Sequence, residues 1–153
     1  MNQEILQKLK ANITLIQIIF GGLLFGIVSF LSAMSLIIIP GSQQSEINEL
    51  FQLIAPIFMV ISVSTSIFLR KAMLAKVHNE TNQLKLIKSY TSTRIIQMAL
   101  MDASILFAIV CFVLTTNTFF TILAGIGILY FVSLFPLQNK VIQQLKLDIP
   151  IGF

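Results

Sequence analysis

The sequence predicts an all-α membrane protein: a bundle of four transmembrane helices built from two helical hairpins. The first observation is composition, because the 153-residue chain is 56% hydrophobic and only 10% charged, with a mean hydropathy of +0.92. A soluble domain usually has about a quarter of its residues charged. The second is the presence of four long apolar runs, and the third is that basic residues flank those runs instead of forming a separate face. This pattern is typical of membrane proteins.

Each apolar run is close to the roughly 20 residues that a helix needs to cross a hydrocarbon core of about 30 Å. We expect spans at about 13–39, 50–70, 92–115 and 118–135, within a single transmembrane domain covering residues 1–153. The first run exceeds a signal-peptide core of about 7–15 residues, so we interpret it as a retained helix. Its extra length predicts that it tilts or protrudes.

The distribution of basic residues predicts the orientation of the chain. Lys and Arg occur in the N-terminal segment, the middle connection and the C-terminal tail. The loop 40–49 has two glutamates and no basic residue, and the loop 115–118 is uncharged. The positive-inside rule then places the N-terminus, the middle connection and the C-terminus of this multi-pass protein in the cytoplasm. Topology accounts for the basic residues, so we expect the lipid bilayer as partner and no nucleic acid.

Two segments outside the spans have helical spacing of apolar residues. They cover about 71–91 and 137–147, and both are predicted to be amphipathic and cytoplasmic. Such a helix lies on the membrane surface or continues the bundle. A simple solvated extension is the alternative that the sequence leaves open.

An internal repeat relates the first span to the third. Gly22–Leu31 aligns with Ser104–Val113, with five identical pairs, from Leu24/Leu106 to Phe30/Phe112. We interpret this as two hairpins related by a pseudo-two-fold axis along the membrane normal, with chance similarity of apolar helices as the alternative. The repeat also conserves a stripe of small residues, listed here in corresponding order: Gly22, Gly26 and Ser29 in the first span, and Ser104, Ala108 and Cys111 in the third. Small residues four apart predict that these two helices pack together.

Asp102, near the middle of the third span, is the one residue that offers chemistry. An ionised Asp at the bilayer centre costs on the order of 2.5–3.5 kcal/mol, so we expect this carboxyl to be protonated, interior and hydrogen-bonded. The candidate partners are Gln17, Gln97 and the serines Ser62, Ser64 and Ser66, which a single helix cannot all aim at one point. Asp102 is then either a carrier of a proton or cation, with Gln17 or Gln97 beside it, or a structural group that fixes helix register.

Other polar residues suggest no catalysis. Arg70, Lys71, Lys88 and Arg94 lie where membrane-boundary cations contact lipid headgroups. His78 has no Cys or acidic neighbour at ligand spacing, so we expect no metal site. No catalytic motif is found, and we expect neither an enzyme nor a cofactor.

Two resemblances arise at the third span. Ala99-Leu-Met-Asp-Ala103, followed by Ile-Leu-Phe-Ala-Ile-Val, resembles the carboxylate helix of the proton-carrying c subunit of rotary ATP synthases, although the Arg-Gln-Pro loop of that family is missing. This resemblance implies that Asp102 binds the ion. The pattern Arg94-x-x-Gln-x-Ala-Leu-x-Asp102, with Phe135-Pro136 and the tail from Lys140 to Asp148, is similar to small four-span bacterial membrane proteins of unknown function. That resemblance implies the topology and a bacterial source.

The sequence therefore favours a non-enzymatic structural or accessory subunit of a membrane assembly, forming a homo-oligomer or binding other membrane subunits. The alternative is a protein that translocates protons or cations through Asp102.

Overall fold

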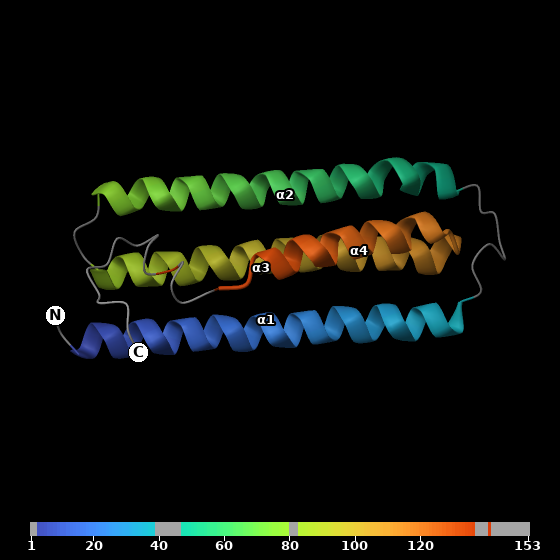
Figure 1. The fold of residues 1–153 in the computed structure, drawn as a ribbon. Coiled ribbons are helices and arrows are strands. Elements are labelled where there is room, and N and C mark those ends of the chain that lie inside the picture. Colours follow the sequence, from blue (N-terminus) through green and yellow to red (C-terminus); the bar gives the residue numbers. More distant parts are fainter. Residues whose placement is uncertain (1–2, 39–46, 80–82, 137–140, 142–153) are drawn as a thin grey trace.

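The computed structural model describes residues 3–38, 47–79, 83–136 and 141. These residues form four α-helices, in chain order α1 Gln3–Ile37, α2 Ile47–Asn79, α3 Gln83–Thr115 and α4 Thr118–Ser133. Successive helices run in alternating directions along one common axis (Figure 1). The start of α1, the end of α2 and the start of α3 therefore lie at the same end of the bundle, and every Lys and Arg among the described residues belongs to these three segments.

Three of the four helices are long and apolar enough to cross a membrane. Their most apolar windows have mean hydropathies of 2.2 in α1, 2.0 in α2 and 2.3 in α3. Helix α4 is also apolar, but its 16 residues extend only about 24 Å at 1.5 Å per residue, less than a core of about 30 Å. The predicted all-α four-helix bundle of a multi-pass membrane protein is confirmed. The fourth helix is shorter than the span predicted at 118–135.

The long helices continue well past the apolar runs. α1 starts before residue 13, and α2 continues through Leu74 to Asn79. α3 starts at Gln83 and runs unbroken into its apolar part. The predicted amphipathic segment 71–91 is thus helical on both sides of residues 80–82, which lie outside the described residues. Of the second such segment, 137–147, the structure describes only Val141, which is buried.

Helix α3 is the centre of the bundle, because each of the other three helices packs against it. Half of its most apolar window is buried, against 22% for α1 and for α2. α1 and α2 lie on opposite sides of α3 (Figure 1). Of the two predicted hairpins, the second is a closely packed pair, α3 with α4. The first is a correction: within the described residues, α1 and α2 pack against α3 instead of against each other.

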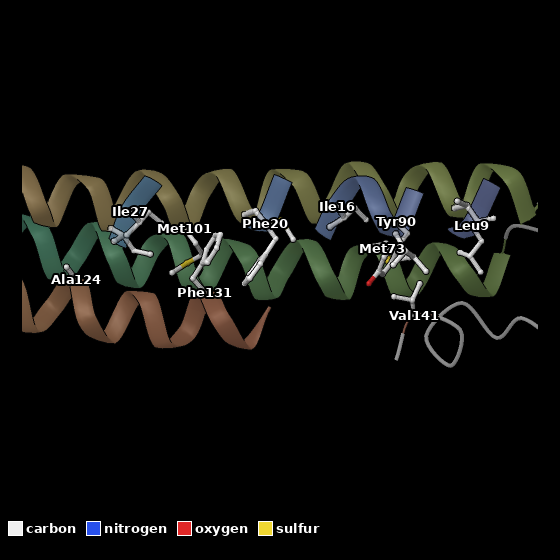
Figure 2. Packing of buried hydrophobic residues seen from close by; sticks show 14 of the residues in the cluster. Leu9, Ile16, Phe20, Ile27, Met73, Tyr90, Met101, Ala124, Phe131 and Val141 are labelled. Carbon is white, nitrogen blue, oxygen red and sulfur yellow. The ribbon is translucent and has the colours of Figure 1, made fainter. Parts of the chain in front are cut away.

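The main core follows the inner faces of α1, α3 and α4. Ile16, Phe20 and Ile27 form the buried stripe of α1, and Met101 of α3 is among the side chains they join (Figure 2). The ring of Phe20 stacks on that of Phe131 in α4, with centroids 4.8 Å apart. Bulky side chains thus determine which face of α1 turns inward, because they bury the most apolar area.

Close approach of α4 depends on a glycine. A Cβ atom at Gly127 would lie 2.7 Å from Cγ1 of Ile105 in α3 and 2.9 Å from Cε of Met59 in α2. A larger residue at this position would force the side chains of Ile105 and Met59 to move. The N-terminus of α4 is fixed by the preceding turn. There Asn117 caps the helix by accepting a hydrogen bond from the Phe119 amide at 2.9 Å. The same Asn117 donates to the Oδ1 of Asn48 in α2.

Candidate functional site

A chain of hydrogen bonds joins three consecutive turns of α3 to α2. The guanidinium of Arg94 donates through Nε to the Tyr90 hydroxyl at 3.0 Å and through Nη1 to Oε1 of Gln97 at 3.2 Å. The amide of Gln97 in turn donates to the backbone oxygen of Ser66 in α2 at 2.6 Å. Tyr90 precedes Arg94 by four residues and Gln97 follows it by three, so all three side chains lie on one face of the helix.

These side chains are deeply buried for their polarity. Arg94 is 9% exposed, Tyr90 3% and Gln97 1%. The guanidinium carbon also lies 5.3 Å from the centroid of the Tyr90 ring, within the range of a cation–π interaction. Arg94 was predicted to contact lipid headgroups, and the structure shows its side chain largely buried between α2 and α3, where it lines a surface depression. The other three predicted headgroup residues, Arg70, Lys71 and Lys88, are exposed.

Asp102 has different surroundings. It is partly buried, at the edge of the exposed face of α3, and it makes no hydrogen bond or ion pair with any residue that the structure describes. Gln97 is five residues before it, which is about 140° around the helix, and is bonded to Arg94 and Ser66 instead.

The other glutamine proposed as a neighbour of Asp102 is also engaged elsewhere. Nε2 of Gln17 in α1 donates to the backbone oxygen of Pro136 at 3.3 Å. This bond ties α1 to the chain just past the end of α4. The structure therefore brings neither Gln17 nor Gln97 to the carboxyl of Asp102.

The serines of α2 divide as helical spacing requires. Ser62 and Ser66 are buried and Ser64 is exposed. The hydroxyls of Ser62 and Ser66 have no hydrogen-bond partner among the described residues. They are the unsatisfied polar groups of the α2 interface, and neither reaches Asp102 with a hydrogen bond.

The small residues of the internal repeat are buried in α3 but exposed in α1. In α3, Ser104, Ala108 and Cys111 are buried. In α1, Gly22, Gly26 and Ser29 are exposed, and nothing lies within 4 Å of a Cβ placed at either glycine. The α1–α3 contact predicted through this stripe is therefore corrected: within the described chain, α1 meets α3 through its opposite, bulky face.

The network that links Arg94 to Tyr90 and, through Gln97, to Ser66 was not predicted from the sequence. The signal was present for Tyr90, because the spacing Tyr90-x-x-x-Arg94-x-x-Gln97 aligns three polar side chains at the start of an apolar span. The acceptor on α2 is a backbone oxygen, so no residue type marks it. Among the described residues, no group of three His, Cys, Asp or Glu side chains could hold a metal ion.

Comparisons with protein-family models, with curated proteins and with solved structures give no match for this chain. The resemblances of the third span to ATP synthase c subunits and to small four-span bacterial proteins therefore assign no family.

Proposed function

We propose that this chain is a non-enzymatic integral membrane protein that serves as a structural or accessory subunit of a membrane assembly. In this proposal it lies in the cytoplasmic membrane of a bacterium, with its N-terminus, the α2–α3 connection and its C-terminus in the cytoplasm. The support for that orientation is the sequence, in which every Lys and Arg falls on one side of the apolar runs.

The observation that carries the proposal is the low burial of two of the three long helices. Only 22% of the most apolar window of α1, and of α2, is buried, against 50% for α3. The outer face of α1 also carries Gly22, Gly26 and Ser29, all exposed. Without a hydrophobic driving force in lipid, helices associate where small residues let backbones approach closely. The outer face of α1 thus suits contact with a transmembrane helix of another subunit or of a second copy.

Native mass spectrometry of the protein, gently extracted from its own host membrane, tests this proposal. We expect a defined complex, either with unrelated subunits or with a small number of identical copies. Detection of the monomer alone would contradict it. A ring of many identical copies would instead favour ion translocation through Asp102.

A substitution on the outer face of α1 locates the contact. Gly26→Leu leaves the fold of the single chain intact, because nothing lies within 4 Å of a Cβ at that position. We expect it to abolish recovery of the complex by blocking close helix approach. Val28→Leu, also exposed on α1 but on another side of the helix, is the matched control and retains the complex. Equal recovery of the complex from both variants would remove α1 from the interface.

Translocation of protons or cations through Asp102 is the second candidate. The observation in its favour is that this carboxyl lies in a membrane-spanning helix, partly exposed and without a hydrogen bond to the described residues, so it is available to an ion. Asp102→Asn separates the two functions in proteoliposomes and in native complexes. If the protein is a carrier, Asp102→Asn loses ion flux but still assembles. If it is an accessory subunit, both the unsubstituted chain and Asp102→Asn assemble normally and neither shows ion flux.

A further inference from the structure

Arg94 is a buried cation whose partners are all neutral. It is 9% exposed, and its hydrogen-bond acceptors are the Tyr90 hydroxyl and the Gln97 amide oxygen. No carboxylate among the described residues forms an ion pair with it. Burial of a charge without a counter-charge is costly, so proteins usually pair such groups or bind an ion beside them.

The guanidinium of Arg94 also has N–H groups that make no hydrogen bond to the described residues. It has five N–H groups, of which one donates to Tyr90 and one to Gln97. The three others make no hydrogen bond to the described residues. Gln97 is itself held by its bond to the Ser66 oxygen, so the guanidinium is fixed in orientation. A planar, fixed set of N–H groups suits the oxygens of a phosphate group.

A second cation lies at the same place. Arg94 lines a shallow surface depression that is too narrow to enclose a water molecule, together with Thr93, Tyr90 and Gln97 from α3 and Met73 and Arg70 from α2. Arg70 is exposed and forms no ion pair with a described residue. Two arginines repel each other unless an anion lies between them. The hydroxyl of Thr93 is a further donor on the same lining.

The sequence places the depression at the level expected for lipid phosphates. Arg70 directly follows the apolar run of α2, and Arg94 directly precedes that of α3. Both therefore lie where a span passes from hydrocarbon to headgroups. An anion at this level comes either from a lipid headgroup or from phosphate dissolved in the adjoining water.

We propose that one phosphate-bearing anion binds over the mouth of the depression between the end of α2 and the start of α3, with the guanidinium groups of Arg94 and Arg70 as its donors. The proposal concerns a binding site and does not depend on the accessory function proposed above.

Lipid binding by the full chain, in a neutral detergent, tests the lipid arm. Native mass spectrometry would measure retention of phosphatidylglycerol as its concentration is raised, for Arg94→Gln and Arg70→Gln. Each substitution removes charge-assisted hydrogen bonds, so we expect the apparent affinity to fall by roughly tenfold. Lys71→Gln and Lys88→Gln remove the same charge from exposed positions that do not line the depression, and should bind like the unsubstituted chain.

Inorganic phosphate provides the second arm. We would follow the melting temperature of the delipidated protein as phosphate is added at constant ionic strength. A chloride salt at the same ionic strength is the reference. Stabilisation by phosphate that is lost in both arginine variants identifies dissolved phosphate as a ligand. If phosphate gives no stabilisation, but retention of phosphatidylglycerol is weakened in both arginine variants, the ligand is the lipid phosphodiester.

Arg94→Gln also perturbs the buried network, so the decisive comparison uses Arg70→Gln and one further variant, Arg94→Lys. Arg70→Gln leaves the bonds of Arg94 to Tyr90 and Gln97 untouched, and Arg94→Lys keeps the charge while it removes the planar fork. We expect both to fold, with unchanged helical content, and to bind more weakly. If neither ligand distinguishes the arginine variants from the two lysine controls, the proposal is overturned.

Discussion

Two charged residues on the same helix, Arg94 and Asp102, have opposite surroundings. Arg94 is 9% exposed and makes hydrogen bonds to two neighbouring side chains of α3. Asp102, eight residues further along, is partly exposed and makes none with the described residues. The segment around Asp102 is the more apolar of the two, yet the arginine is the better buried. Hydropathy along a helix therefore does not decide which polar side chain turns inward.

The difference arises from the residues one turn away. Arg94 has a tyrosine four residues before it and a glutamine three residues after it, and an oxygen atom of each accepts a hydrogen bond from the guanidinium. The equivalent neighbours of Asp102 are all apolar, namely Met98, Ala99, Ile105 and Leu106. A polar side chain can be buried at little cost where its own helix supplies partners. Without them it remains at an edge, where water, an ion or another chain can reach it.

The largest effect should come from removing the central member of the Arg94 network. Gln97→Leu takes away an acceptor of the buried guanidinium and the bond to the Ser66 oxygen, and we expect it to destabilise the chain by about 2–3 kcal/mol. Denaturant titration in micelles, followed by circular dichroism, measures this change. Gln52→Leu, an exposed position of α2, is the control and should shift the midpoint little. Equal shifts would mean that the network adds no stability.

A smaller loss is expected at the other end of the network. Tyr90→Phe keeps the ring that stacks near Arg94 and removes only the hydroxyl that accepts from Nε, for an expected loss of about 1–2 kcal/mol. Tyr130→Phe is the matched control, because no hydrogen bond of the Tyr130 hydroxyl to a described residue is present. The same denaturant titration measures both variants. A loss of stability in Tyr130→Phe as large as that in Tyr90→Phe would show that the bond to Arg94 adds no stability.

The smallest effect should be at Asp102. Asp102→Asn removes no hydrogen bond to a described residue, so we expect the stability of the isolated chain to change by less than about 0.5 kcal/mol. A loss as large as that of Gln97→Leu would show that the carboxyl is structurally bonded, and would end the contrast with Arg94.

Much of the fold could be predicted from the sequence, since long apolar runs with basic flanks are characteristic of membrane-spanning helices. The central position of α3 could not, because it depends on which face of each helix is bulky and which is small. The small residues of α1 suggested a packing face, but Ile16, Phe20 and Ile27 on the opposite face bury more apolar area within one chain. The shortness of α4 was obscured because the apolar run continues beyond Ser133, where the helix has already ended.

The candidate site was predicted less completely. Arg94 and Gln97 were both identified, but as members of two different sites, because glutamine was considered only as a neighbour of Asp102. Helical angles could have separated Gln97 from Asp102, whereas the acceptor on α2 is a main-chain atom and leaves no mark in the sequence.

The shortness of α4 also affects the lipid around the protein. Beside α1 the apolar surface spans a full bilayer, but beside α4 the helix extends only about 24 Å. The apolar helical surface that α4 offers to acyl chains is therefore shorter than that of α1. Such uneven mismatch favours local thinning of the bilayer or a tilt of the whole bundle. Bilayers of shorter acyl chains should accordingly accommodate this protein with less distortion than thick ones.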